Sequence, residues 1–180
     1  VDLSNFRKLP PPNTPLRVIG AIGRLDEQKG FDLLIKAFRQ TTNPNIALHV
    51  YGEGAEKSKL QRLAKGDPRI EFKGFAADPV TAMAAVDVVA MPSRWEAYGL
   101  VAIEALAAKR LLLVNGIDGL RDHLENGAQA ATLEGGIASW QQTIERLTVP
   151  RHYKTTHPDQ PKIRLEDNYA LSWSKLLHSL

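Results

Sequence analysis

The sequence predicts an α/β fold, a Rossmann-like doubly wound parallel sheet of about six strands with helices on both faces. Short β-branched or apolar segments alternate with amphipathic helical segments of about 8 to 12 residues, a pattern typical of βαβ units. Apolar runs such as Leu111–Val114 have the length of a strand and not of a membrane span. With 180 residues the chain can bury a full core, and right-handed crossovers then favour a doubly wound sheet.

Each element is expected from its own pattern of residues. The strands are expected at 17–22, 46–51, 69–74, 87–91 and 111–114, with a weaker one near 130–133. The helices are expected from Phe31 onward with Leu34, Ile35 and Phe38 on one face, then at 55–66, about 79–86, 99–108 and about 120–126, and last with Ile137, Trp140, Ile144 and Leu147 on one stripe. Trp140 is therefore expected in the core.

Two proline-rich stretches flank this predicted domain. Residues 1–16 contain four prolines and are expected to form a linker from a preceding N-terminal domain, without a regular element. Residues 17–147 form the predicted Rossmann-like unit. Residues 148–180 are expected to be a surface excursion and a closing helix, with Asp167 as N-cap and Trp173 on its apolar stripe.

Composition narrows the classes of partner. The formal net charge of +3 suits an anionic small ligand or an anionic membrane surface, and is too weak to indicate nucleic-acid binding. The absence of cysteine excludes disulfides and thiolate metal sites and fits a reducing compartment, so we expect a cytoplasmic location, with peripheral membrane contact open. The residues that could touch acidic lipid are Arg151, Lys154, Lys162 and Arg164, and those that could bind a metal are His152, His157 and Asp159; a solvated loop explains both sets more simply.

Two unusual loops follow the first and fourth predicted strands. If the strand order is 3-2-1-4-5-6, these strands are neighbours, and a ligand binds in the crevice between their carboxyl ends. The first loop, Gly23–Gly30, supplies Arg24 and Lys29, a forked guanidinium and a mobile ammonium that suit a diphosphate. The second loop leads at Gly99 into a helix whose free N–H groups form a second anion site. The sequence therefore predicts a pocket for a pyrophosphate-bearing ligand.

Two glutamates lie near this helix start. Glu104 is one turn inside the helix among apolar neighbours, where a carboxylate is costly unless it is paired or hydrogen-bonded, so we expect it to face a polar group such as a ribose diol. Glu96 lies in the loop, where it can face the reacting end of the ligand. The alternatives are purely structural: Arg24 and Lys29 as solvated charges paired with Asp26 or Glu27, Glu104 in an ion pair with Arg121, and Glu96 as an exposed loop carboxylate.

The sequence resembles the group 1, family-four glycosyltransferases of GT-B fold, from about Val1 to Leu147. Four segments match in order and spacing: GRLDEQKGFDLLIKAF, GFAAD, VDVVAMPSRWEAYGLVAIEALAA and GLRDHLENG. The resemblance implies the C-terminal, nucleotide-sugar-binding half of a two-domain enzyme. It implies transfer with retention of configuration and no obligatory metal, from a nucleoside-diphosphate sugar, UDP favoured and GDP next.

The acceptor implied is a glycan or a lipid-linked molecule, as in surface polysaccharide or lipopolysaccharide assembly. The preceding domain would hold the acceptor site, so this part alone would be inactive.

Site residues follow from the resemblance by matching position. Arg24, Lys29 and Glu96 would be the catalytic residues, the two cations stabilising the departing diphosphate and Glu96 holding hydroxyls of the donor sugar. Glu104 would hold the ribose hydroxyls. The rest of the donor-binding set would be Gly23, the loop at Phe75 bordering the base, and the backbone N–H groups of Tyr98, Gly99, Leu100 and Val101.

The chain also departs from the family pattern. Lys109, Arg110 and Leu111 replace the usual Gly-x-Pro after the helix, which removes a favoured C-cap glycine that two cations would partly replace. Asp118-Gly119 replaces a Gly-Gly turn, and Asp122 the glutamate after it.

Two other classes of nucleotide-binding protein lack their motifs in this sequence, and two classes remain as alternatives. A nicotinamide dehydrogenase needs G-x-G-x-x-G after the first strand, where this chain has GAIGRLDEQKG, and no P-loop motif occurs. A non-catalytic nucleotide-binding module stays open, as does a sugar-nucleotide epimerase or phosphorylase of the same architecture.

Overall fold

The computed structural model describes residues 2–125, 130–132 and 136–148, and it confirms the predicted fold class. Six parallel strands form one sheet in the order β3-β2-β1-β4-β5-β6, the doubly wound order that was expected. The strands are β1 (Val18–Ile22), β2 (Ala47–Tyr51), β3 (Ile70–Gly74), β4 (Val88–Met91), β5 (Leu111–Val114) and β6 (Ala130–Thr132).

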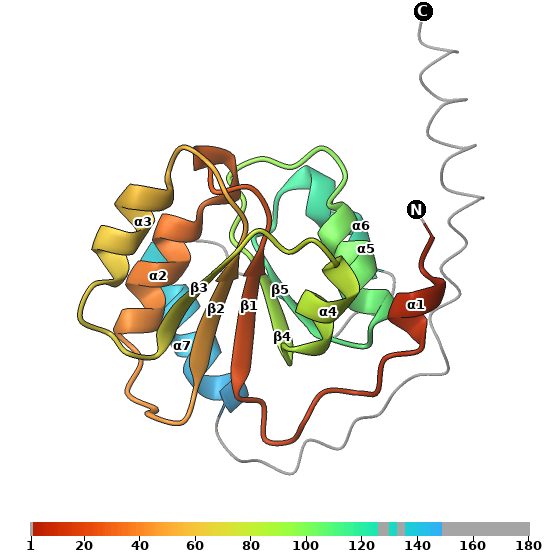
Figure 1. The fold of residues 1–180 in the computed structure, drawn as a ribbon, viewed down its shortest axis with the longest axis horizontal. Helices are drawn as coiled ribbons and strands as arrows, with labels where there is room; N and C mark the ends of the chain where they lie inside the picture. Colours follow the sequence, from red (N-terminus) through yellow and green to blue (C-terminus); the bar gives the residue numbers. More distant parts are fainter. Residues whose placement is uncertain (1, 126–129, 133–135, 149–180) are drawn as a thin grey trace, which may run out of the picture.

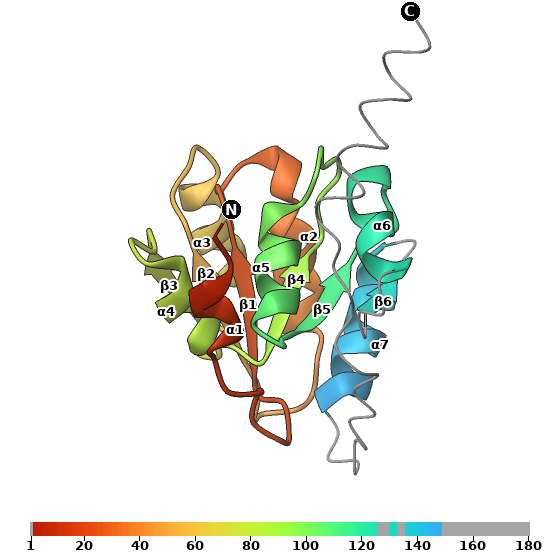
Figure 2. The same cartoon turned by 90° about the vertical axis from the view of Figure 1, so that its right-hand side faces the viewer.

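Helices cover both faces of the sheet (Figure 1). One layer contains α2, α3 and α7, and the other contains α1, α4 and α5, with α6 packed against α5 (Figure 2). Their bounds are α1 (Ser4–Arg7), α2 (Phe31–Arg39), α3 (Lys57–Ala64), α4 (Pro79–Ala84), α5 (Leu100–Ala107), α6 (Asp118–Glu125) and α7 (Gly136–Thr148), and a short 3-10 turn, η1 (Glu27–Lys29), precedes α2.

The sheet separates two apolar cores. Under α2 and α7, Phe38 and Trp140 are completely buried, which confirms the core position predicted for Trp140. On the other face, Met83 of α4 and Ile103 of α5 pack over Leu112. Each such side chain contributes about 1.5–3 kcal/mol of burial free energy. The sheet is thus a rigid support for the loops at its carboxyl edge.

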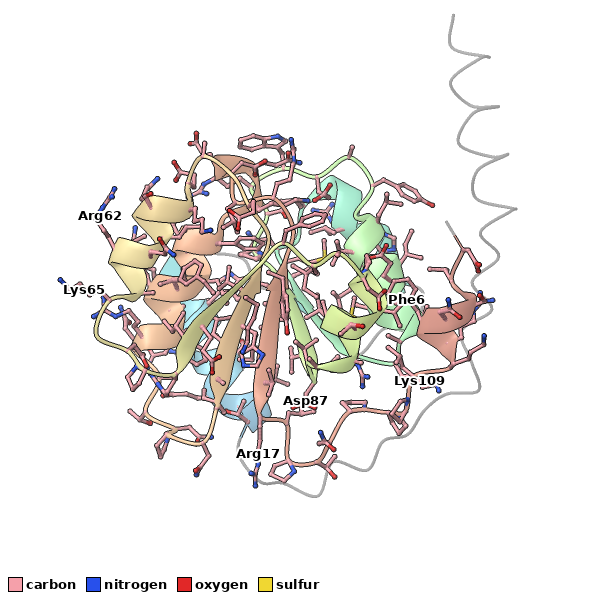
Figure 3. All side chains as sticks on the ribbon, in the orientation of Figure 1. Phe6, Arg17, Arg62, Lys65, Asp87 and Lys109 are labelled. Carbon is pink, nitrogen blue, oxygen red and sulfur yellow. The ribbon has the colours of Figure 1, made fainter. Side chains whose placement is uncertain are left out.

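The first 16 residues differ from the irregular linker that their prolines predicted. Ser4–Arg7 form a short helix, and Leu3 and Phe6 are 4% and 5% exposed because they pack into the core beside α4 and α5. Figure 3 shows Phe6 at this junction, close to Lys109. Leu3 and Phe6 are three residues apart, the spacing of one helical face, so the signal was present ahead of the prolines.

Lys109 and Arg110 were expected to compensate for a missing glycine at the C-terminus of α5, but their side chains bind elsewhere. Lys109 adopts the left-handed conformation, φ 60°, that a C-cap glycine usually supplies. The two side chains do not cap the end of α5 but bind carbonyl groups of other segments. Lys109 Nζ donates to Arg7 and Leu9 at 3.3 and 3.0 Å, and Arg110 donates to Met83 and Pro10, both at 3.0 Å. Both cations therefore fasten the N-terminal segment to the domain.

Asp87 fastens the same segment at the amino edge of the sheet. It is 4% exposed and accepts hydrogen bonds from the backbone N–H groups of Asn13, Arg17 and Val18 at 3.1, 2.9 and 2.9 Å. Figure 3 shows Asp87 and Arg17 at this end of the central strands. The loops that follow β1 and β4 lie at the opposite, carboxyl edge of the sheet.

Several sequence-based expectations lie outside the described residues. They are the closing helix with Asp167 and Trp173, the histidines and aspartate at 152, 157 and 159, the basic residues at 151, 154, 162 and 164, and the side chains of Asp118 and Asp122. Within residues 2–125, 130–132 and 136–148, no helix has the length and apolarity needed to cross a membrane.

Candidate binding site at the carboxyl edge of the sheet

The loops after β1, β2 and β3 lie against one another at this edge. The backbone N–H of Gly23 donates to Tyr51 O at 3.0 Å, and that of Gly52 to Gly74 O at 2.7 Å. Gly52 has φ 138°, and a Cβ there would lie 1.8 Å from Gly23 O, so only glycine permits this approach. The loop after β1 is therefore held in place by the loop after β2, without the help of a ligand.

A short turn places Lys29. The carboxylate of Asp26 caps η1 by accepting from the Lys29 backbone N–H at 3.2 Å. Gly30 then turns left-handed, φ 65°, and a Cβ on it would lie 2.2 Å from Pro92 O of the second loop. A side chain at position 30 would separate the two loops, so glycine brings the start of α2 against the loop that follows β4.

Arg94 joins the two loops, a role that the sequence analysis missed. Its backbone N–H donates to Gln28 O at 2.8 Å, and Gln28 Nε2 donates to Trp95 O at 3.1 Å. Its guanidinium donates to Glu27 O at 2.7 Å and to Asp32 Oδ2 at 2.9 Å. Burial alone would raise the pKa of Asp32, but the hydrogen bond and charge of Arg94 lower it below its usual value. No sequence spacing marks this contact, since its partners belong to η1 and α2, more than 60 residues earlier.

Asn115, at the end of β5, supports the second loop from behind and was also missed. Its amide nitrogen donates to the carbonyls of Pro92 and Ser93 at 2.9 and 3.1 Å. Its oxygen accepts from Trp140 Nε1 at 3.1 Å, which gives the indole N–H a partner inside the core. A polar residue directly after an apolar strand at this edge was the available signal.

Lys29 and Glu96 form the central ion pair of the site. Lys29 Nζ lies 2.6 Å from Glu96 Oε2, and the two side chains are only 15% and 10% exposed. Ser93 Oγ lies 3.5 Å from the same oxygen. The alternative of a solvated Lys29 paired with Asp26 or Glu27 is wrong, as is that of an exposed Glu96. The predicted convergence of the two loops is confirmed for this pair.

Arg24 is not brought to this pair. Its side chain is 74% exposed, with Nη2 3.2 Å from Asp26 Oδ2 and 3.1 Å from Gln28 Oε1. For Arg24 the structural alternative, a solvated charge paired with Asp26, therefore describes the arrangement. Gly23 lies nearer the centre, because a Cβ on it would be 3.5 Å from the Lys29 stem.

The second loop ends at an open helix start. Gly99 has φ 68° and precedes α5. Within the described part of the chain, the backbone N–H groups of Gly99, Leu100 and Val101 donate to no group. Tyr98 and Leu100 have side chains that are 37% and 48% exposed. Three N–H groups at the positive end of a helix, with no acceptor among the described residues, are an arrangement that suits an anion.

Glu104 lies one turn into α5 and is half-buried. Burial raises the pKa of its carboxyl above the usual value, because the charged form loses hydration. The alternative of an ion pair with Arg121 is not seen: Arg121 donates to Gly116 O at 2.9 Å, and Glu104 has no cationic partner among the described residues. A half-buried carboxylate without a cation suits a ligand that offers hydroxyl donors.

Phe75 follows β3 at the same edge, and the residue is 75% exposed. It borders a pocket of about 230 Å³ that also contacts Tyr51 at the end of β2 and Thr81 of α4. The position predicted to border a base therefore lies beside a cavity.

These loops and strands match a known family. A model described as "Glycosyl transferases group 1" matches residues 16–148, which include the whole described sheet. The chain is a group 1 glycosyltransferase by family. The resemblance drawn from the sequence motifs is thereby confirmed.

Relatives of this group 1 glycosyltransferase chain are much longer than it is. Soluble starch synthase 1 of Oryza sativa subsp. indica is 36% identical over 144 residues, 76% of this chain and 22% of that protein. The poly(ribitol-phosphate) alpha-N-acetylglucosaminyltransferase of Staphylococcus aureus is 29% identical over 142 residues, 73% of this chain and 29% of that protein. The chain thus spans 20% and 22% of the first two starch synthases that it matches.

Solved structures of the same architecture include nucleotide complexes. S. aureus TarM, crystallised with UDP, superposes with a TM-score of 0.70 at 23% identity, over 82% of this chain and 31% of that one. Anabaena HepE, crystallised with UDP and glucose, gives 0.63 at 25% identity, over 73% of this chain and 38% of that one. The group 1 glycosyltransferase fold of the chain is therefore found in proteins that bind UDP.

Proposed function

We propose that this chain is the donor-binding half of a retaining glycosyltransferase that takes a sugar from a nucleoside-diphosphate sugar. The observation that supports this best is the Lys29–Glu96 ion pair, 2.6 Å long, between the loop after β1 and the loop that leads to the start of α5, where three N–H groups have no acceptor among the described residues. A cation and a helix start suit the diphosphate of such a donor, and a carboxylate next to them suits its sugar.

In this proposal the cationic side stabilises the leaving group. The Lys29 ammonium has three donors, so it can keep its bond to Glu96 and still bind a phosphate oxygen. The N–H groups of Gly99, Leu100 and Val101 add fixed dipoles where negative charge develops on the departing diphosphate. Arg24 lies at the rim, and its weak exposed contacts to Asp26 and Gln28 can exchange for phosphate at little cost.

The two glutamates act on the two sugars of the donor. Lys29 and Ser93 both contact Oε2 of Glu96, which leaves Oε1 to accept from hydroxyls of the transferred sugar. Glu104, which is half-buried and has no cationic partner in the part of the chain that the structure describes, accepts from the ribose diol. The loop at Phe75 borders the base beside the 230 Å³ pocket. We prefer a positioning role for Glu96 over a nucleophilic one.

The donor base is proposed from the neighbours. TarM and HepE were crystallised with UDP, which supports a uridine donor. A guanosine donor is the next candidate, as the family resemblance implies. The relatives named above make starch or modify poly(ribitol phosphate), which supports a glycan acceptor. A lipid-linked acceptor, a lipopolysaccharide pathway, metal independence and a cytoplasmic site with peripheral membrane contact stay part of the proposal. The acceptor site would lie on the preceding N-terminal domain.

A thermal-shift series tests this function. The 180-residue chain is heated with UDP, GDP, ADP and NAD, with and without Mg²⁺. A ligand at about 100 times its Kd adds about 2.7 kcal/mol, which raises Tm by about 5–10 °C for a domain of this size. We expect a metal-independent shift with one nucleoside diphosphate, UDP first, and its loss in Arg24→Ala/Lys29→Ala.

The matched control is Arg62→Ala/Lys65→Ala, which removes the same two charges. Figure 3 shows both residues projecting from the α3 region, away from the two loops. An unchanged shift in Arg24→Ala/Lys29→Ala, or equal losses in both double variants, would contradict the proposed site.

A further inference from the structure

The first turn of α6 packs closely against the loop before α5. A Cβ on Gly119 would lie 1.9 Å from Glu96 O, and a Cβ on Gly99 would lie 2.6 Å from Leu120 Cδ2. Leu120 itself is completely buried. These contacts show that α6 supports the backbone from Glu96 to Gly99, the stretch that joins the ion pair to the open helix start.

His123, one turn further along α6, adds a polar contact to this packing. Its Nε2 lies 2.8 Å from Tyr98 O, and its side chain is only 9% exposed. A carbonyl oxygen only accepts, so Nε2 is the nitrogen with the proton. The rings of Tyr98 and His123 also meet edge-on, with centroids 6.0 Å apart and planes at 79°. His123 is thus held on two sides by Tyr98.

This hydrogen bond fixes a peptide group, not only a side chain. The Tyr98 carbonyl belongs to the same planar unit as the Gly99 N–H, and in a trans peptide these two groups point in opposite directions. When His123 holds the carbonyl toward α6, the Gly99 N–H is turned away from α6. Gly99 has no side chain to hinder rotation of this unit, so the loss of the His123 hydrogen bond would weaken the restraint on the orientation of the peptide.

We infer that His123 is a positioning residue for the diphosphate of the donor. It acts through the Tyr98–Gly99 peptide, which it orients so that the Gly99 N–H joins those of Leu100 and Val101 in one anion site. Preorganised donors stabilise developing charge without reorganising when the reaction takes place. The inference rests on the proposed function, since it assigns a role within that site.

The test compares two substitutions in the 180-residue chain. His123→Leu keeps an apolar volume but cannot donate, whereas the amide nitrogen of His123→Gln can donate from a similar distance. By calorimetry we expect His123→Leu to bind UDP about tenfold more weakly than wild type, a loss typical of one hydrogen bond. The UDP affinity of His123→Gln should lie within about threefold of the wild-type affinity. Uridine, which has no phosphate, should bind all three proteins equally.

A merely structural role would give a different pattern. It would weaken the binding of UDP and of uridine together, in proportion to the loss of Tm. The His123→Gln variant would then not restore the binding of UDP alone. If the Leu variant does not fold, His123→Asn provides the same contrast, because its shorter amide does not reach the Tyr98 carbonyl. A shift of the Gly99 amide resonance in the nucleotide-free variant reports the released peptide directly.

Unchanged UDP binding by the Leu variant, with wild type binding normally, would overturn the role of His123 and leave the proposed function standing. If wild type binds GDP instead of UDP, the same comparison is made with GDP and guanosine. No binding of any of these nucleoside diphosphates by wild type would overturn the proposed function, and the inference with it.

Discussion

Lys29 and Glu96 are 67 positions apart in the sequence, yet their side chains meet at 2.6 Å where the loop that follows β1 contacts the loop that follows β4. Both are almost completely shielded from water, so each charge depends on the other for compensation.

The first prediction concerns the energy of this pair. Lys29→Met leaves the carboxylate of Glu96 shielded and without its cation, and we expect a loss of about 1–3 kcal/mol of unfolding free energy. Glu96→Gln should cost a similar amount. The double variant should cost less than the sum, with a coupling of about 1–2 kcal/mol, measured by urea unfolding. Strictly additive single losses would show that the pair adds nothing to stability.

The second prediction concerns Arg94 and pH. Arg94 lowers the pKa of Asp32, and a group whose folded pKa is depressed adds stability above its unfolded pKa and loses it as the pH falls through the folded one. Wild type should therefore be more stable than Arg94→Leu at neutral pH by about 1 kcal/mol. This part of the difference should shrink as the pH falls from about 4 toward the lowered pKa.

Arg94→Lys distinguishes charge from geometry in this contact. Lysine keeps the charge, but one ammonium cannot replace the guanidinium fork that reaches Glu27 O and Asp32 together. A Lys variant as stable as wild type, with unchanged UDP affinity, would count against Arg94 as the link between the loops.

The third prediction concerns Glu104. Its folded pKa is raised by burial, so its contribution to stability is most favourable below its ordinary pKa and is lost as the pH rises through the folded value. Glu104→Gln should therefore gain stability relative to wild type as the pH rises, measured by thermal unfolding. The same variant should bind UDP about tenfold more weakly or worse, because a carboxylate accepts from a ribose diol better than an amide does.

The pH dependence of ligand binding checks the same residue from the other side. Uridine affinity of wild type should fall as Glu104 becomes protonated, and Glu104→Gln should show no such dependence. Equal pH profiles for the two proteins would exclude Glu104 from the ribose site.

The fourth prediction separates a steric clash from backbone strain. Gly30 and Gly66 both have positive φ, 65° and 90°, but a Cβ on Gly30 would lie 2.2 Å from Pro92 O, whereas nothing lies within 4 Å of one on Gly66. Gly66→Ala should cost about 1 kcal/mol, the penalty of the left-handed conformation. Gly30→Ala should cost at least about 2 kcal/mol more, because the loops must separate. Similar losses would mean that the loops can part freely.

Much of this fold follows from local patterns in the sequence. The succession of strands and helices could be anticipated because short apolar segments alternate with amphipathic helical ones, whereas the strand order was an assumption that the structure bears out. The face of α2 with Phe31, Leu34 and Phe38 was readable from helical periodicity alone. Such features depend on neighbours in sequence, and they were predicted well.

The features that escaped prediction depend on distant neighbours. Arg94 and Asn115 have no motif of their own, and their partners, Asp32 of α2 and Pro92 of the loop after β4, are brought to them only by the folded sheet. His123 lies at an ordinary helical position, and its importance depends on a carbonyl 25 residues earlier. At the N-terminus, the prolines after Leu9 led to the prediction of an irregular linker, although the spacing of Leu3 and Phe6 indicated a short helix. The ion pair was placed in the right crevice, but its direct contact was not foreseen.

The contacts of the N-terminal segment with the domain determine where the chain can be truncated without loss of stability. The family match begins at residue 16, yet Leu3 and Phe6 cover apolar surface beside α4 and α5, and Asp87 takes backbone partners from residues 13 to 18. A chain trimmed to begin at Arg17 would expose an apolar patch and leave the side chains of Lys109 and Arg110 without several carbonyl acceptors. Such a truncated protein should aggregate, whereas one that begins before Leu3 retains an intact solvent-facing surface.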